Sequence, residues 1–354
     1  MIDDSTYVYV SLGVLSVNLG FFISKGVSFS SFSSFGLNDL PPYRLFLFFE
    51  FIYLCFLVFL FYRLNALVDI WSEYWRVRFY FFGLELDGVN VSILKNSIFA
   101  NIFFLFKYFS FVSFLVSLPF FFLYNRRLLF YISLINIFLY CIVSGGRDVI
   151  AYLIVFVFFA FYSKIYTRSA FYIFLAFAFV MLMTYLRQGG FEKTLYALFS
   201  YFTGSLVFFD HHIQNVDSYS YGSLIVSTMF SLLVSIFGLH NESVAVGTDL
   251  MMFVQISDES QYYNFYNALP TMFYYIYKDF GYFPSLLFMV YFGFFLGLIV
   301  HRLKLNNYFH VSVLSFVMYT LLWTIFRPEP IMFGSIFTLF FALYFSRIIR
   351  FRRY

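Results

Sequence analysis

Long apolar runs, separated by short polar loops, repeat along the whole chain. A helix needs about 20 mostly apolar residues to cross a hydrocarbon core of roughly 30 Å. By this measure the sequence predicts about eleven membrane-spanning helices, within a range of about 10–12. They lie near residues 7–23, 45–62, 98–123, 128–143, 149–162, 169–186, 195–210, 223–239, 282–300, 308–326 and 331–347. The expected fold class is all-α: a polytopic integral membrane protein whose residues 1–354 form a single multi-span domain.

Composition excludes a soluble fold. Hydrophobic residues make up 62% of the chain and charged residues 11%, whereas soluble domains carry roughly 25% charged residues. A soluble protein of this length could not hide so much apolar surface. The net charge is +4, without a long basic block, so nucleic acid is not an expected partner. The lipid bilayer is the first partner that the sequence predicts.

The distribution of Lys and Arg predicts the orientation, because cytoplasmic loops carry an excess of both. Four arginines between residues 347 and 353 place the C-terminus in the cytoplasm. Counting spans backward puts the acidic segment 240–281 outside as a long extracytoplasmic loop, together with the short loops 144–148 and 186–190. Before residue 97 the orientation stays open, because segment 63–96 carries four basic and four acidic residues.

The first short outer loop has the chemistry of an anion site. It reads Ser144-Gly145-Gly146-Arg147-Asp148. Glycines before an arginine allow backbone N–H groups to converge on an anion, and the guanidinium adds a bidentate phosphate contact. The alternative is a tight turn between two helices, with Arg147 anchored to lipid headgroups or paired with Asp148.

The second short outer loop repeats this pattern two spans later, with Arg187 before Gly189 and Gly190. Two antiparallel spans between the loops bring Arg147 and Arg187 to the same membrane face. Two arginines with glycine neighbours on one outer surface predict a clamp for a diphosphate group.

The long outer segment supplies candidate general bases. Loops of this length in a compact protein are usually functional or disordered. We expect His240 or Glu242 to be catalytic, and the sequence does not rank them against Asp249, Asp258 and Glu259. A merely solvated loop is the alternative for each of them.

The sequence allows two roles for Asp279, which lies close to the following span. It can cap a helix N-terminus, with Pro284 in the first turn of the helix that follows. Alternatively, it orients the substrate or acts as a base at the membrane surface, and for this reason it joins the candidate catalytic residues.

Two charged residues lie inside predicted spans. Glu50 is close to the start of its span, from which its side chain can reach outward, whereas Lys107 is near mid-bilayer and is expected to face a cavity. The chain shows no DxD or HExxH motif and no Cys/His cluster. Neither a bound metal nor another cofactor is therefore expected.

The order of these motifs resembles the Wzy-type O-antigen polymerases, the oligosaccharide repeat-unit polymerases. The resemblance covers about residues 125–300: the GGR loop, the Y-x-R-x-G-G loop, the YFTGSL stretch at 201–206, the long outer loop, and DFGYFPS before a glycine-bearing span. The N-terminal third shows no such pattern.

This resemblance implies a metal-independent glycosyltransferase of the bacterial inner membrane. Such an enzyme transfers a growing glycan from one undecaprenyl diphosphate carrier to the next lipid-linked repeat unit at the periplasmic face. Arg147 and Arg187 then bind the diphosphate, while a carboxylate or histidine of 240–281 activates the acceptor hydroxyl. The implied partners are the lipid-linked oligosaccharide, a chain-length regulator and the repeat-unit flippase.

Two other classes remain open on the sequence. An O-antigen ligase also has a long periplasmic loop with arginines, but His240 is the only histidine in the loop here. A transporter or flippase of lipid-linked oligosaccharide would need charged residues that face a mid-bilayer cavity, for which Lys107 is the one candidate.

Overall fold

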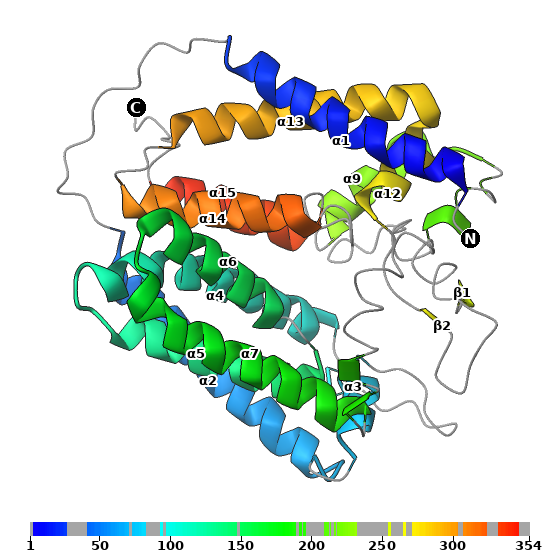
Figure 1. The fold of residues 1–354 in the computed structure, drawn as a ribbon. Helices are drawn as coiled ribbons and strands as arrows, with labels where there is room; N and C mark the ends of the chain where they lie inside the picture. The colour runs from blue at the N-terminus through cyan, green and yellow to red at the C-terminus, as the bar shows by residue number, and fades with distance from the viewer. Residues whose placement is uncertain are drawn as a thin grey trace. The chain divides into compact units, whose positions relative to one another are not determined.

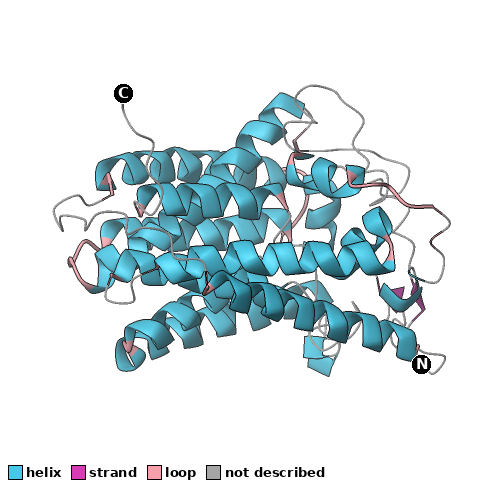
Figure 2. Cartoon of the chain, turned by 90° about the horizontal axis from the view of Figure 1, so that it is seen from above, coloured by secondary structure: helices cyan, strands magenta, loops and turns pink. Residues whose placement is uncertain are grey.

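A computed structural model of the chain (Figure 1) gives its fold as almost entirely helical. It describes residues 3–26, 41–70, 73–82, 93–94, 97–146, 149–188, 191–192, 194–195, 209–211, 213, 216, 218–231, 254–255, 265–266, 271–303, 307–323 and 332–346. Figure 2 shows that most of these residues are helical, and the strands among them form one short pair. The chain divides into two compact units, each of which is described by itself. A single multi-span domain therefore stays a prediction.

Unit 1 contains Met1–Leu37, Leu198–Lys304 and Thr320–Ile336. Its elements are α1 (Asp4–Ser24), α9 (Ser223–Met229), β1 (Val254–Gln255), β2 (Phe265–Tyr266), α12 (Met272–Phe280) and α13 (Tyr282–Arg302). β1 and β2 are antiparallel, with Val254 opposite Tyr266. The segment expected as an outer loop therefore contains a short strand pair and a helix.

Unit 2 contains Asn38–Ala197, Leu305–Tyr319 and Phe337–Tyr354. Its elements are α2 (Tyr43–Asn65), the 3-10 turn η1 (Tyr74–Arg76), α3 (Val77–Phe82), α4 (Ser97–Phe122), α5 (Leu128–Ser144), α6 (Val149–Ser163), α7 (Tyr166–Gln188) and most of α14 (Tyr308–Trp323) and α15 (Phe333–Phe345). α2, α4 and α5 pack on one another. Part of segment 63–96, whose orientation the sequence left open, packs inward: the hydroxyl of buried Tyr74 donates a hydrogen bond to the carbonyl of Cys141 at 2.9 Å.

The structure supports a helical membrane protein. Among the described residues, four helices are long and apolar enough to cross a membrane, namely α1, α2, α4 and α13. The predicted spans at 128–143, 149–162, 169–186, 308–326 and 331–347 correspond to shorter apolar helices of 10–17 residues. The predicted span at 195–210 lies mostly outside the described residues, and within the predicted span at 223–239 the structure describes residues 223–231, which include α9. The total of eleven stays a prediction.

α1 and α13 are arranged with small residues inside and large apolar residues outside. On α13, the side chains of Phe283, Leu287, Tyr291 and Phe295 recur every four residues and are 61–77% exposed. Such an unbroken apolar stripe is unfavourable in water but is solvated by lipid tails. This pattern is typical of helices that pack through small residues in a membrane.

Glycines on the inner faces let the backbones of α1 and α13 approach closely. A methyl group at Gly293 would overlap the carbonyl oxygen of Val17, and one at Gly297 would overlap the side chain of Ser24. Gly20 faces a backbone carbonyl of α13 in the same way. Without a strong hydrophobic force between helices in lipid, this close van der Waals contact is what holds the pair together.

Gly293→Ala is therefore expected to destabilise the protein. The added methyl forces the two helices apart, and overpacking of this kind costs about 1–3 kcal/mol. The thermal unfolding midpoint of the purified protein should fall by several degrees, at roughly 2–4 °C per kcal/mol.

The matched control is Gly26→Ala, because a methyl there meets only the carbonyl oxygen of Ile23, at an ordinary 3.6 Å. Its midpoint should stay close to that of the wild type. Equal midpoints for the two variants would contradict the close helix contact.

Candidate functional site

The turn that begins at Gly145 and the end of α7 lie at the same end of unit 2. α6 begins at Val149, just after the turn, and packs against α7. A short connection at residues 164–165 joins the two helices. α7 then runs back along α6 and ends at Gln188 (Figure 1). Because α7 has 23 residues and α6 has 15, α7 extends roughly 12 Å beyond the first residue of α6.

Gly145 and Gly146 close the end of α5. Gly145 has φ 60°, the left-handed conformation that favours glycine at a helix C-terminus. The N–H of Gly146 donates a hydrogen bond to the hydroxyl of Ser144 at 3.1 Å. The Gly146 N–H is thus used within the turn, and the anion-binding role of Gly145 and Gly146 stays a prediction. Arg147 and Asp148 lie outside the described residues, so the arginine's role as an anion ligand stays a prediction.

Arg187 belongs to a helix and not to a loop. The sequence placed it in a loop at 186–190, whereas the backbone of α7 continues to Gln188. Gly189 and Gly190 lie outside the described residues.

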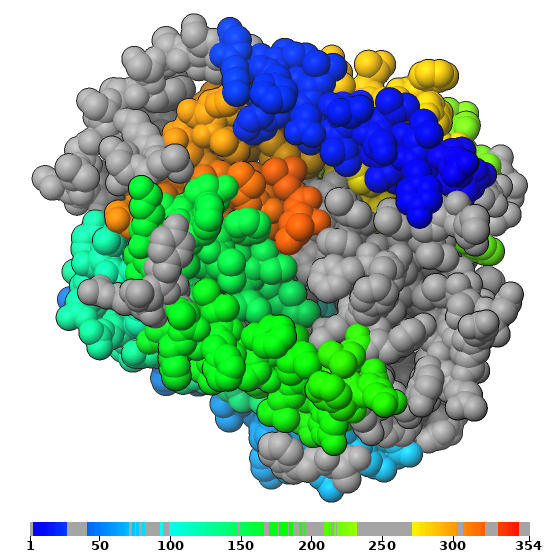
Figure 3. All heavy atoms as spheres, viewed as in Figure 1, coloured from blue at the N-terminus to red at the C-terminus, as the bar shows by residue number. Residues whose placement is uncertain are grey.

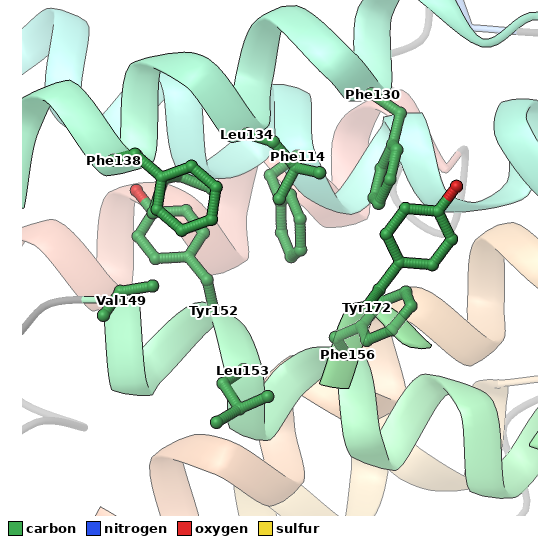
Figure 4. Close-up of a pocket in the computed structure, with 10 residues that line it drawn as sticks. Phe114, Phe130, Leu134, Phe138, Val149, Tyr152, Leu153, Phe156 and Tyr172 are labelled. Carbon is green, nitrogen blue, oxygen red and sulfur yellow. The ribbon is translucent and has the colours of Figure 1, made fainter. Parts of the chain in front are cut away.

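An apolar pocket lies between α4, α5, α6 and α7 (Figure 4). Phe130, Phe156 and Tyr172 stand around one end of it, and Val149 lines the other end. Val149 directly follows the turn that carries Arg147. Since no charged residue lines the pocket, its chemistry suits a hydrocarbon chain.

Asp279 caps a helix that is distant in sequence. Its carboxylate accepts hydrogen bonds from the backbone N–H groups of Leu224 at 3.1 Å and Ile225 at 2.7 Å, the second and third residues of α9. The expectation that Asp279 caps the next helix is wrong, because α13 begins after Gly281, while Pro284 does lie in its first turn. Asp279 is fully buried, so its carboxylate serves first as this cap. A catalytic role for it stays a prediction.

Tyrosines surround the end of α12 near Asp279. Tyr9 donates its hydroxyl hydrogen bond to the side chain of Ser285 at 2.7 Å. Burial raises the pKa of Tyr275 above its usual value. Partial burial, and then the neighbouring Tyr219, raise the pKa of Tyr277. The phenols of Tyr275 and Tyr277 therefore stay protonated at neutral pH, which excludes them as general bases.

The two charged residues of the spans occupy different surroundings. Lys107 places its Nζ atom 4.5 Å from the ring centroid of Tyr140, a cation–π distance. The expectation that Glu50 reaches outward is wrong, since Glu50 is 1% exposed and accepts a hydrogen bond from the side chain of Asn136. The only sequence signal for this contact was an asparagine within the apolar run 128–143.

The remaining predicted bases fall outside the described part of the chain. They are His240 and Glu242, with Asp249, Asp258 and Glu259. Their catalytic assignment stays a prediction.

Asp279→Ala is expected to lower the stability of the protein. It leaves two buried N–H groups of α9 without an acceptor, which costs about 1–3 kcal/mol. Asp279→Asn retains one side-chain oxygen and should lose less. Thermal unfolding of the purified variants measures both effects.

Asp4→Ala is the matched control, because Asp4 is an exposed acidic residue at the start of α1. It should unfold like the wild type. If Asp279→Ala kept wild-type stability, the cap would not be the main role of this carboxylate.

The comparison with known proteins yields no relative of this chain. No family model, no curated protein and no solved structure matches it. The resemblance to Wzy-type polymerases therefore rests on the loop motifs alone. It supports a proposed function, but it does not assign the chain to a family.

Proposed function

We propose that this chain polymerises undecaprenyl-diphosphate-linked repeat units by glycosyl transfer at the periplasmic face of a bacterial inner membrane. The apolar helices support a location in a membrane. The motifs at 144–148, 186–190 and 279–285 support the reaction class through their resemblance to Wzy-type polymerases.

The observation that carries the proposal is the α6–α7 hairpin. In the sequence α6 begins two residues after Arg147, α7 contains Arg187, and the start of α6 and the end of α7 lie at one end of unit 2. Arginine keeps its charge at any working pH and binds phosphate oxygens through two parallel hydrogen bonds. The N-terminus of α6, next to Arg147, adds the positive end of a helix dipole.

The pocket beside this turn has walls of the same apolar character as the lipid part of this substrate, although its volume of about 30 Å³ is too small to enclose an isoprene unit. A polyprenyl diphosphate has a charged head attached to a long hydrocarbon chain. The pocket of α4–α7 has aromatic and aliphatic walls, and it begins at Val149, immediately after the turn with Arg147. A head group near Arg147 would therefore have an apolar surface next to it for the first isoprene units.

The proposed chemistry follows from the leaving group. A lipid diphosphate departs as an anion, so its departure needs charge stabilisation, which two arginines supply. The acceptor hydroxyl needs a general base, which contributes about 10²–10⁴-fold to the rate when well placed. We assign this role to His240, Glu242 or another acidic residue of 240–268, because the carboxylate of Asp279 already accepts two backbone hydrogen bonds.

A chain-length regulator and the repeat-unit flippase are proposed partners, since one sets the number of transfers and the other delivers repeat units. Both would act in the same membrane. The lipid-linked oligosaccharide is donor and acceptor at once.

Arg147→Ala and Arg187→Ala are each expected to reduce polymerisation by about 10²–10³-fold, the usual cost of losing one group that stabilises a departing anion. Arg187→Lys should recover only part of the loss, because lysine cannot make the bidentate contact. The assay joins purified lipid-linked repeat units in detergent, and gel banding of surface glycan in a polymerase-deficient strain provides the second readout.

The matched control is Arg168→Ala, which removes an arginine at the opposite end of the same helix as Arg187. It should retain the full glycan ladder. Full ladders from the Arg147 and Arg187 variants, at equal protein levels, would contradict the clamp. If the variants still polymerised the glycan but failed to transfer the finished glycan from its carrier, the protein would be a ligase. If repeat units stayed on the cytoplasmic leaflet, it would be a flippase.

A further inference from the structure

Unit 2 contains a buried carboxyl group that the proposed glycosyl transfer does not use. Glu50 lies roughly 10 Å along α2 from its first residue, within a helix long enough to span the membrane. Its side chain is 1% exposed. The Glu50 carboxyl has no ion-pair partner among the residues that the structure describes.

Neutral polar groups from two other helices surround this carboxyl. Asn136 of α5 donates through its Nδ2 atom to the Oε2 atom of Glu50 at 2.5 Å and to the backbone carbonyl of Glu50 at 2.9 Å. The hydroxyls of Ser110 and Ser113 on α4 face the same carboxyl group. All three of these neighbours are buried.

Several oxygen atoms of this cluster have no hydrogen-bond partner. They are Glu50 Oε1, Asn136 Oδ1 and Ser113 Oγ, and the hydroxyl of Ser133, one turn before Asn136, is unpaired as well. A buried polar atom without a partner is costly, and a buried carboxylate without a counter-charge costs far more. A cation bound here would remove both penalties together.

We propose that Glu50 and the oxygen atoms around it bind one small monovalent cation, a proton or a sodium ion, between α2, α4 and α5. One carboxylate balances one positive charge, and carboxylate, amide and hydroxyl oxygens are the ligands that hard cations take. Intramembrane carboxyl groups with polar neighbours commonly mark such sites.

Other titratable side chains lie one helical turn away, toward the Gly145 end of unit 2. They are Tyr53 on α2, Lys107 on α4 and Tyr140 on α5. Lys107 forms no ion pair with Glu50 in the described structure, and its Nζ atom lies over the ring of Tyr140. Lys107 is thus the alternative source of positive charge for the Glu50 carboxylate, and the experiment must distinguish its effect from that of a bound ion.

The test is thermal unfolding of the purified full-length protein at constant ionic strength. One series replaces choline with sodium, and the other varies the pH without sodium. A bound cation stabilises the folded state by mass action, so the wild-type midpoint should rise by roughly 3–5 °C for each tenfold increase in the free concentration of that cation. A response to sodium identifies sodium, and a response to acid alone identifies the proton.

Glu50→Gln, which is neutral and of the same shape, should abolish this response. The matched control is Glu73→Gln, because Glu73 is a carboxylate of the same unit whose side chain is 42% exposed and pairs with Arg76 at 3.4 Å. That variant should respond as the wild type does. A wild-type midpoint indifferent to both sodium and pH would overturn the proposal and point to Lys107 as the counter-charge.

A second measurement uses the wild-type protein and so does not depend on whether a variant folds. Dicyclohexylcarbodiimide is an apolar reagent that adds to a protonated carboxyl group and leaves a stable acylurea, which peptide mass spectrometry detects. Labelling of Glu50 that falls in alkaline buffer supports a proton, and labelling that sodium suppresses but choline does not supports sodium. An unlabelled Glu50 peptide under all of these conditions would contradict the proposal.

Discussion

The absence of water in the hydrocarbon core is the constraint that shapes this protein. Inside lipid, each backbone polar group must be bonded within its own helix, and each polar side chain needs a partner within the protein. Large apolar side chains can face outward at no cost, so small residues can line the helix contacts. α1 and α13 follow this rule directly, because Gly20 and Gly293 each lie against the backbone of the other helix and a stripe of large apolar residues on α13 faces out.

The same constraint explains why polar residues in the spans come in contacting sets. Glu50 and Asn136 bond to each other across two helices, and Lys107 lies over the ring of Tyr140. Asp279 supplies the acceptors that the first turn of α9 lacks. Each contact satisfies a group that would otherwise lie in an apolar environment without a partner.

Apolar length and turn residues made the helices predictable. The predicted spans at 128–143 and 149–162 each end one residue before the corresponding helices, α5 and α6. The left-handed conformation of Gly145 marks the end of α5. α1 begins three residues earlier than predicted, since Asp3 caps it and accepts from the N–H of Ser5. Periodicity and capping are local properties, and the sequence displays them directly.

The partners of the buried polar groups were not predictable, because they are far apart in the chain. Glu50 and Asn136 are separated by 86 residues, and Asp279 and Leu224 by 55. A single sequence contains no signal that pairs such positions, and nearness to a helix end wrongly suggested an outward Glu50. The shared end of Gly146 and the end of α7 was predictable, since a two-span hairpin returns the chain to the end from which it started.

The central claim is that the arginines at 147 and 187 act at one outer membrane surface, and cysteine accessibility in intact cells tests it most directly. In a background with Cys55→Ala and Cys141→Ala, single changes Asp148→Cys, Gly189→Cys and Lys164→Cys report on the two ends of the α6–α7 hairpin. The account predicts that a membrane-impermeant maleimide labels positions 148 and 189 from outside, and position 164 only after the membrane is permeabilised. Labelling of 164 alone in intact cells, or of only one of 148 and 189, would contradict it.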